Sequence, residues 1–144
     1  MRRISLITIG VADLARARAF YDDWLGWVPA NGPPGVHFYQ QGGLVVALWP
    51  RADLVADAKL ADAAPKDGFG GIALAHNVAD KAEVAQLLAR AAELGGRILK
   101  PAQDTFWGGH SGYVADLDGH VWEIGYNPFW TRGDDGSVTL GGSW

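Results

Sequence analysis

The sequence contains one internal repeat, and this repeat limits the possible fold more than any other feature. Three short patterns occur twice, in the same order and at nearly the same offset. Each match alone could arise by chance, but three in one order indicate a duplicated module of roughly 70 residues. The matched patterns are Val11-Ala12-Asp13 with Val78-Ala79-Asp80, Leu25-Gly26 with Leu94-Gly95, and Leu48 and Pro50 with Ile124 and Pro128.

Each module is predicted to have the order β-α-β-β-β. In both, a strand leads to a helix that is capped by an aspartate (Asp13 or Asp80) and ends at a glycine (Gly26 or Gly95). Glu83 lies three residues after Asp80 and predicts a capping box. The predicted strands are residues 4–9, 27–28, 36–40 and 44–49 in the first module, and residues 71–78, 97–99, 112–115 and 120–126 in the second.

The repeat also predicts how the chain is divided. We expect a single domain over residues 1–144, with module one at about residues 3–50 and module two at about residues 69–128. Residues 51–68 form a linker, of which residues 52–61 are helix-prone and the rest is loop. Residues 129–144 are a glycine-rich tail with a possible hairpin at Asp135-Gly136.

Composition excludes several classes of protein. The chain has no cysteine, so a disulfide scaffold, a thiolate zinc site and a cysteine nucleophile are excluded. The net charge of −4 argues against a nucleic-acid partner. The densest apolar run, residues 44–49, is much shorter than a membrane-spanning helix. We therefore expect a soluble, cytoplasmic protein.

Two stretches of the sequence carry a resemblance to a known family. With the duplicated module, they resemble the vicinal oxygen chelate superfamily, which includes glyoxalase I, extradiol dioxygenases and bleomycin-binding proteins. The resemblance implies an α+β fold, two tandem β-α-β-β-β modules forming a U-shaped mixed sheet, and a homodimer. The stretches are Val11-Ala12-Asp13-Leu14 with Phe20-Tyr21 and Leu25-Gly26-Trp27, and the run GYVADLDGHVWEI over residues 112–124.

The same resemblance locates the metal ligands that some members use, on the first and last strand of each module. Counted from the capping aspartates, these positions are Leu6, Ala47, Ala73 (or Gly71 if the second loop is longer) and Glu123. Only Glu123 can coordinate a metal, and one carboxylate does not hold a catalytic ion. The sequence therefore predicts no metal and no cofactor.

The four histidines offer only an unusual alternative. His76 lies three residues from Ala73, so a regular strand points it to the opposite face unless a β-bulge intervenes. His120 follows a turn and is expected to be structural. His37 and His110 flank glycine-rich segments near strand ends, and neither has a partner at ligand spacing.

Aromatic and polar side chains supply the candidate ligand-binding residues. Trp107, in a glycine-flanked loop, is either a stacking platform for a planar ligand or part of a dimer interface. Glu123 is either a general base or the partner of a cationic ligand, or it is a remnant of an ancestral site whose carboxylate pairs with an arginine or a backbone donor. Tyr113 lies ten residues before Glu123, the spacing of a catalytic tyrosine in the extradiol dioxygenases, and could donate a hydrogen bond to a ligand. Trp49 and Asn77 complete the set, whereas Trp24, Trp27 and Trp122 are expected in the core.

These residues support three competing functions. The first is a metal-free protein that binds an aromatic or cationic small molecule, like the bleomycin-binding members. The second is an enzyme, either a glyoxalase-like lyase or a dioxygenase-like oxidoreductase, in which Glu123 acts with non-standard ligands or without a metal. The third is a ligand sensor that would need a separate DNA-binding partner.

Overall fold

The structure is a computed structural model that describes residues 1–61 and 69–141, so the predicted loop at residues 62–68 and the last three residues lie outside it. The chain forms two compact units, Met1–Gly70 and Gly71–Trp144. Both contain a mixed sheet covered by helix, which confirms the predicted α+β class.

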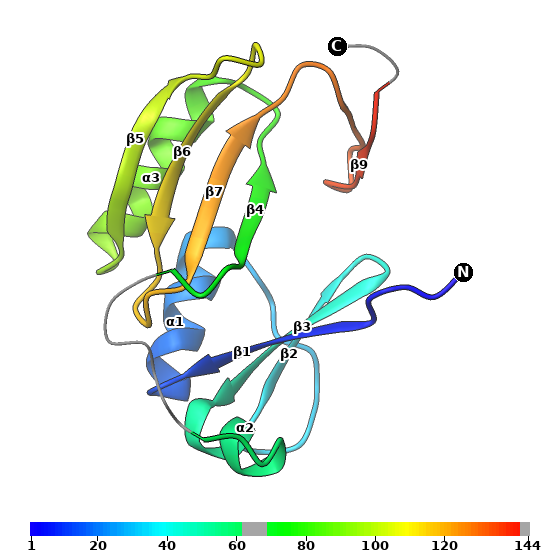
Figure 1. The fold of residues 1–144 in the computed structure, drawn as a ribbon, viewed down its shortest axis with the longest axis vertical. Coiled ribbons are helices and arrows are strands. Elements are labelled where there is room, and N and C mark those ends of the chain that lie inside the picture. Colours follow the sequence, from blue (N-terminus) through cyan, green and yellow to red (C-terminus); the bar gives the residue numbers. More distant parts are fainter. Residues whose placement is uncertain (62–68, 142–144) are drawn as a thin grey trace. The chain divides into compact units, whose positions relative to one another are not determined.

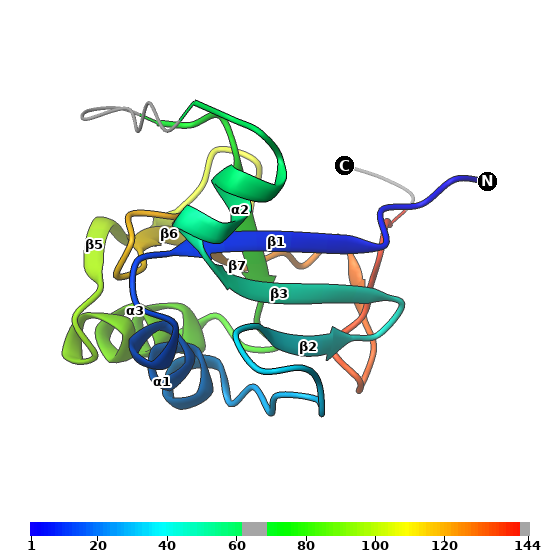
Figure 2. The ribbon, with the colours of Figure 1, turned by 90° about the horizontal axis from the view of Figure 1, so that it is seen from below.

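The first unit is a three-stranded sheet in the order β1-β3-β2, with β1 parallel and β2 antiparallel to β3. Helices α1 and α2 lie on opposite faces of it (Figure 2). The elements are β1 (Leu6–Val11), α1 (Leu14–Leu25), β2 (His37–Gln41), β3 (Leu44–Pro50) and α2 (Arg51–Asp57).

Helix α1 has the boundaries that its sequence predicts. The side chain of Asp13 accepts a hydrogen bond from the Arg16 amide at 3.0 Å, and Gly26 ends the helix with a φ of 67°. The predicted strand at residues 27–28 is wrong, because the chain there is irregular. The indole of Trp27 instead stacks on Tyr21, with the ring centres 5.1 Å apart.

The second unit is a four-stranded sheet in the order β4-β7-β6-β5, and α3 lies along one face of it (Figure 1). Its first four strands and helix have the predicted β-α-β-β-β order, and the hairpin predicted at Asp135-Gly136 follows them. The elements are β4 (Ala73–Asn77), α3 (Ala82–Glu93), β5 (Arg97–Asp104), β6 (His110–Ala115), β7 (Val121–Tyr126), β8 (Thr131–Arg132) and β9 (Val138–Thr139).

Helix α3 buries an apolar stripe of Val84, Leu88 and Ala91. The predicted capping box at its start is wrong: the helix has no side-chain cap, and only the backbone carbonyl of Asp80 accepts a hydrogen bond from Glu83. Strand β5 is longer than predicted and reaches Asp104. In the part of the chain that the structure describes, no helix is long and apolar enough to cross a bilayer.

Candidate functional site

One face of the second sheet is closed by α3. Trp122 and Ile124 of β7 are buried, as expected for core residues. Any side chain on Gly112 of β6 would overlap Leu88 of α3, so Gly112 lets the helix approach the sheet closely. Because Gly112 is paired with Ile124, the side chain of Ile124 lies on the same face and points toward the helix.

The other face, which we call the site face, carries the polar candidates. Side chains alternate along a strand, so Tyr113 and Glu123 point away from α3. In the parallel pairing of β4 with β7, Ala75 is the partner of Glu123 and Asn77 is the partner of Gly125. Residues from three adjacent strands therefore meet on this face.

Tyr113 and Glu123 are strand partners across β6 and β7, so their side chains lie on the same face of the sheet. Burial raises the pKa of Tyr113 above its usual value, and the negative charge of the neighbouring Glu123 raises it further. Tyr113 therefore stays protonated at neutral pH and places a neutral hydroxyl beside the carboxylate of Glu123.

A pocket of about 360 Å³ opens on the site face, within the size range of small-molecule sites. It brings together three of the five predicted ligand-binding residues, namely Glu123, Trp107 and Asn77. Tyr113 does not line it but is the strand partner of Glu123 on the same face. Trp49 lies at the end of β3 in the first unit, so its part in a site stays a prediction.

The floor of the pocket is Gly125. A β-carbon at this position would lie 3.3 Å from Asn77 Oδ1 and 4.0 Å from Glu123 Oε1. Both oxygens therefore border the space above the glycine. The absence of a side chain there exposes one carboxylate and one carboxamide to a ligand.

Sequence reasoning missed three lining residues, Gly125, Asn127 and Trp130. A usable signal was present, because the dipeptide Phe-Trp occurs twice, at residues 106–107 and 129–130. Both tryptophans line the pocket and both are half-buried. The second one lies four residues after the end of β7, in the segment that follows the strand of Glu123.

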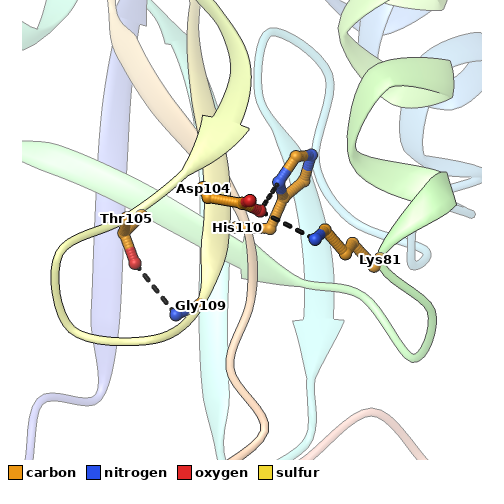
Figure 3. Close-up of polar contacts among 5 residues, drawn as sticks. All are labelled: Lys81, Asp104, Thr105, Gly109 and His110. Atoms are coloured by element: carbon orange, nitrogen blue, oxygen red, sulfur yellow. Dashed lines mark hydrogen bonds and ion pairs between the residues drawn. The ribbon is translucent and has the colours of Figure 1, made fainter.

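The histidines occupy four separate places. His76 is paired with Ile124 on the α3 side of the sheet, where burial, and next the charge of Arg132, lower its pKa, so that it is neutral. His37 borders a hollow beside α1, in the first unit. His110 contacts Asp104 at 2.9 Å (Figure 3), and the backbone of His120 donates to Asp116 in a turn.

The residues present do not fit the metal site of the metal-dependent members. Leu6, Ala47 and Ala73, the positions at which the resemblance places ligands, have no donor atom in their side chains. Over residues 1–61 and 69–141, no three His, Asp or Glu side chains gather in an arrangement that could hold an ion. No step proposed below passes through a metal.

Comparison with known proteins places this geometry in a family. The model of the Glyoxalase/Bleomycin resistance protein/Dioxygenase superfamily matches residues 3–124. A glyoxalase-related enzyme from Fulvimarina pelagi is 41% identical, with a TM-score of 0.88, over 99% of this chain and 100% of its own. No curated protein sequence matches the chain significantly.

More distant structures share the fold. A lactoylglutathione lyase from Agrobacterium tumefaciens is 26% identical, with a TM-score of 0.62, over 89% of this chain and 96% of its own. A family member from Burkholderia phytofirmans is 19% identical, with a TM-score of 0.75, over 85% of this chain and 96% of its own. By its match over most of its length and its duplicated β-α-β-β-β plan, the chain belongs to the Glyoxalase/Bleomycin resistance protein/Dioxygenase superfamily.

Proposed function

We propose that the pocket on the site face binds a small aromatic cation without the help of a metal ion. The observation that carries this proposal is the set of side chains that line one hollow: the carboxylate of Glu123, the indoles of Trp107 and Trp130, and the amides of Asn77 and Asn127. Among the residues that the structure describes, no cationic side chain lines this pocket, and Glu123 is the one acidic residue that does.

This set matches the chemistry of a planar cation. Indole faces attract flat rings by stacking and positive charge through the ring quadrupole. A carboxylate in a partly dehydrated hollow supplies the counter-charge and favours a charged ligand over a neutral one of the same shape. Tyr113 lies beside the carboxylate as its strand partner, and Gly125 leaves Glu123 Oε1 accessible from the pocket.

The test uses N-methylquinolinium, a planar cation, and quinoline, which has a similar shape and is neutral at pH 7.5. Calorimetry should show tighter binding of the cation. Trp107→Ala should weaken it about tenfold, the scale of a lost stacking and cation–π contact. Phe106→Ala is the matched control, because Phe106 is the adjacent residue, is fully exposed and does not line the pocket. Equal affinity for both compounds would contradict the proposal.

An enzyme is the second candidate, and two observations favour it. Tyr113, whose pKa is raised by burial and next by the charge of Glu123, lies beside that carboxylate on the neighbouring strand as a neutral acid next to a base. The relative from Fulvimarina pelagi, at 41% identity, is described as a glyoxalase-related enzyme. Glu123 would then accept a proton from the bound substrate. Turnover of the methylglyoxal–glutathione hemithioacetal, or of a catechol, that survives chelator but is lost in Glu123→Gln would establish this function. Stoichiometric bound metal accompanied by turnover would overturn the metal-free binder.

A further inference from the structure

The loop that carries Trp107 is held at its base by a polar network outside the pocket. We infer that Lys81 and Asp104 are positioning residues that hold the Trp107 indole in place as a preformed wall of the pocket. This inference rests on the proposed function of that pocket. We call residues 104–110 the Trp107 arm.

The network converges on a single oxygen atom. Lys81 Nζ lies 2.7 Å from Asp104 Oδ1, and His110 Nδ1 lies 2.9 Å from the same oxygen (Figure 3). Asp104 and His110 are also strand partners at the end of the β5–β6 hairpin. Hydrogen bonds from Lys81, and next from His110, lower the pKa of Asp104, so it is ionised and accepts from both.

Backbone hydrogen bonds shape the tip of the arm. The amide of Gly109 donates to Thr105 Oγ1 at 2.9 Å, and its carbonyl accepts from the Thr105 amide at 3.0 Å. Gly108 has a φ of +93°, which a residue with a side chain rarely adopts. The tip is thus a closed turn of defined shape.

The indole of Trp107 folds back over this turn. A β-carbon on Gly109 would overlap the Trp107 ring, so the ring lies directly against the Gly109 backbone. A β-carbon on Gly108 would lie 3.0 Å from the ring of Phe129, the residue before Trp130. The two segments that carry the pocket tryptophans therefore meet at the tip of the arm.

A second hollow beside the Trp107 arm explains why the ion pair between Lys81 and Asp104 is needed to hold the arm. It measures about 300 Å³ and is lined by residues of the arm together with Lys81 and Tyr126. Tight packing therefore does not hold the arm on this side. Lys81 precedes α3, so its ion pair ties the arm to the start of that helix. Ordering a binding wall before the ligand arrives reduces the entropy lost on binding.

The first measurement is made without any ligand. Protein labelled with 5-fluorotryptophan gives a fluorine resonance for Trp107, assigned by its loss in Trp107→Phe, and hydrogen exchange reports on the Gly109 amide. Lys81→Met and Asp104→Asn should each shift that resonance and speed the exchange about threefold, the modest scale of exposed ion pairs. Lys81→Arg should restore both signals. Lys100→Met, an exposed lysine on β5, is the matched control.

The second measurement is the affinity for N-methylquinolinium. Each variant should weaken it about threefold, and the double variant no further than either single one, because both remove the same contact. Unchanged Trp107 and Gly109 signals in Asp104→Asn would overturn the inference. Changed signals with unchanged affinity would overturn the link to the pocket. If the wild type binds no N-methylquinolinium, the proposed function fails. The Trp107 resonance and the Gly109 exchange rate, measured without ligand, still decide whether Lys81 and Asp104 hold the Trp107 arm in place.

Discussion

The two units share one strand register but differ in chemistry at equivalent positions. In the first unit Phe38 of β2 is paired with Ala47 of β3, whereas in the second Tyr113 of β6 is paired with Glu123 of β7. An apolar pair in the first unit thus corresponds to a pair of ionisable residues in the second. Duplication supplied two similar sheets, and only one of them carries ionisable chemistry on the face away from its longer helix.

At a second pair of equivalent positions, the two units differ in the size of the side chains. Gly10 of β1 is paired with Trp49 of β3, whereas Asn77 of β4 is paired with Gly125 of β7. The large side chain of β3 therefore corresponds to the glycine that forms the pocket floor in β7. The comparison teaches that one glycine, placed two residues after Glu123, leaves room for a pocket on the second sheet.

Each unit also contains a tyrosine beside a carboxylate, on different faces of its sheet. In the first unit Tyr39, which is fully buried, donates a hydrogen bond to Asp22 of α1 at 2.9 Å. This bond joins the sheet to its helix. In the second unit Tyr113 and Glu123 are neighbours on two adjacent strands, on the face opposite α3, and the charge of Glu123 raises the pKa of Tyr113 in addition to burial. The first pair is therefore expected to stabilise the fold and the second to shape the site.

The largest expected effect comes from placing at Gly125 the tryptophan that the first unit has at the equivalent position, Trp49. Gly125→Trp should weaken binding of N-methylquinolinium more than about 100-fold, because the indole fills the pocket. Gly125→Ala should weaken it several-fold, because the new β-carbon lies 3.3 Å from Asn77 Oδ1. Gly70→Trp is the control, since within the described residues a β-carbon at Gly70 would meet no atom within 4 Å apart from its chain neighbours. Circular dichroism checks folding, and wild-type affinity in folded Gly125→Ala and Gly125→Trp would contradict the comparison.

Removing the charge that distinguishes the second unit should have the next largest effect. Glu123→Gln is expected to weaken binding of the cation about 10- to 30-fold, because charge-assisted hydrogen bonds and ion contacts at the weaker end of their range contribute about 1.5–2 kcal/mol. Quinoline affinity should not change. Glu93→Gln, at the exposed end of α3, is the matched control. Unchanged affinity for the cation would remove Glu123 from the site.

The two tyrosine–carboxylate pairs should differ in their effect on stability. Tyr39→Phe should lower the free energy of unfolding by about 1–3 kcal/mol, because Oδ1 of the partly buried Asp22 loses its donor and only Arg18 still donates to the carboxylate, at Oδ2. Tyr113→Phe should lower it by less than about 1 kcal/mol, because Tyr113 is only half-buried. Urea unfolding of both variants measures the difference. Equal losses would show that the two pairs have the same role.

The smallest effect concerns the titration of Tyr113. Glu123→Gln should lower the pKa of Tyr113, because it removes the carboxylate charge, while burial keeps that pKa above its usual value. A raised pKa in the folded state contributes stability that is present below about pH 10 and is lost as the pH rises through the folded value. Carbon-13 NMR of the labelled phenol measures the change. A pKa that stays the same would place Glu123 too far away to interact.

Local sequence signals predicted most of the fold. The alternation of side chains around Glu123 correctly placed Trp122 in the core, and Asp13 and Gly26 correctly marked the ends of α1. The errors arose where tertiary contacts prevailed. Trp27 stacks on Tyr21 in place of a strand, and α3 begins without the side-chain cap that Asp80 predicted.

The sequence by itself determined the module order, the apolar residues at the family's metal-ligand positions and the identity of Glu123 as the single acidic candidate among them. These properties follow from local periodicity and from residue chemistry. Only the tertiary structure decided that Gly125, Asn127 and Trp130 share a pocket with it, and that Lys81 reaches the arm that carries Trp107. Such contacts depend on strand pairing and on loop conformation, which bring distant residues together and leave no regular spacing in the sequence.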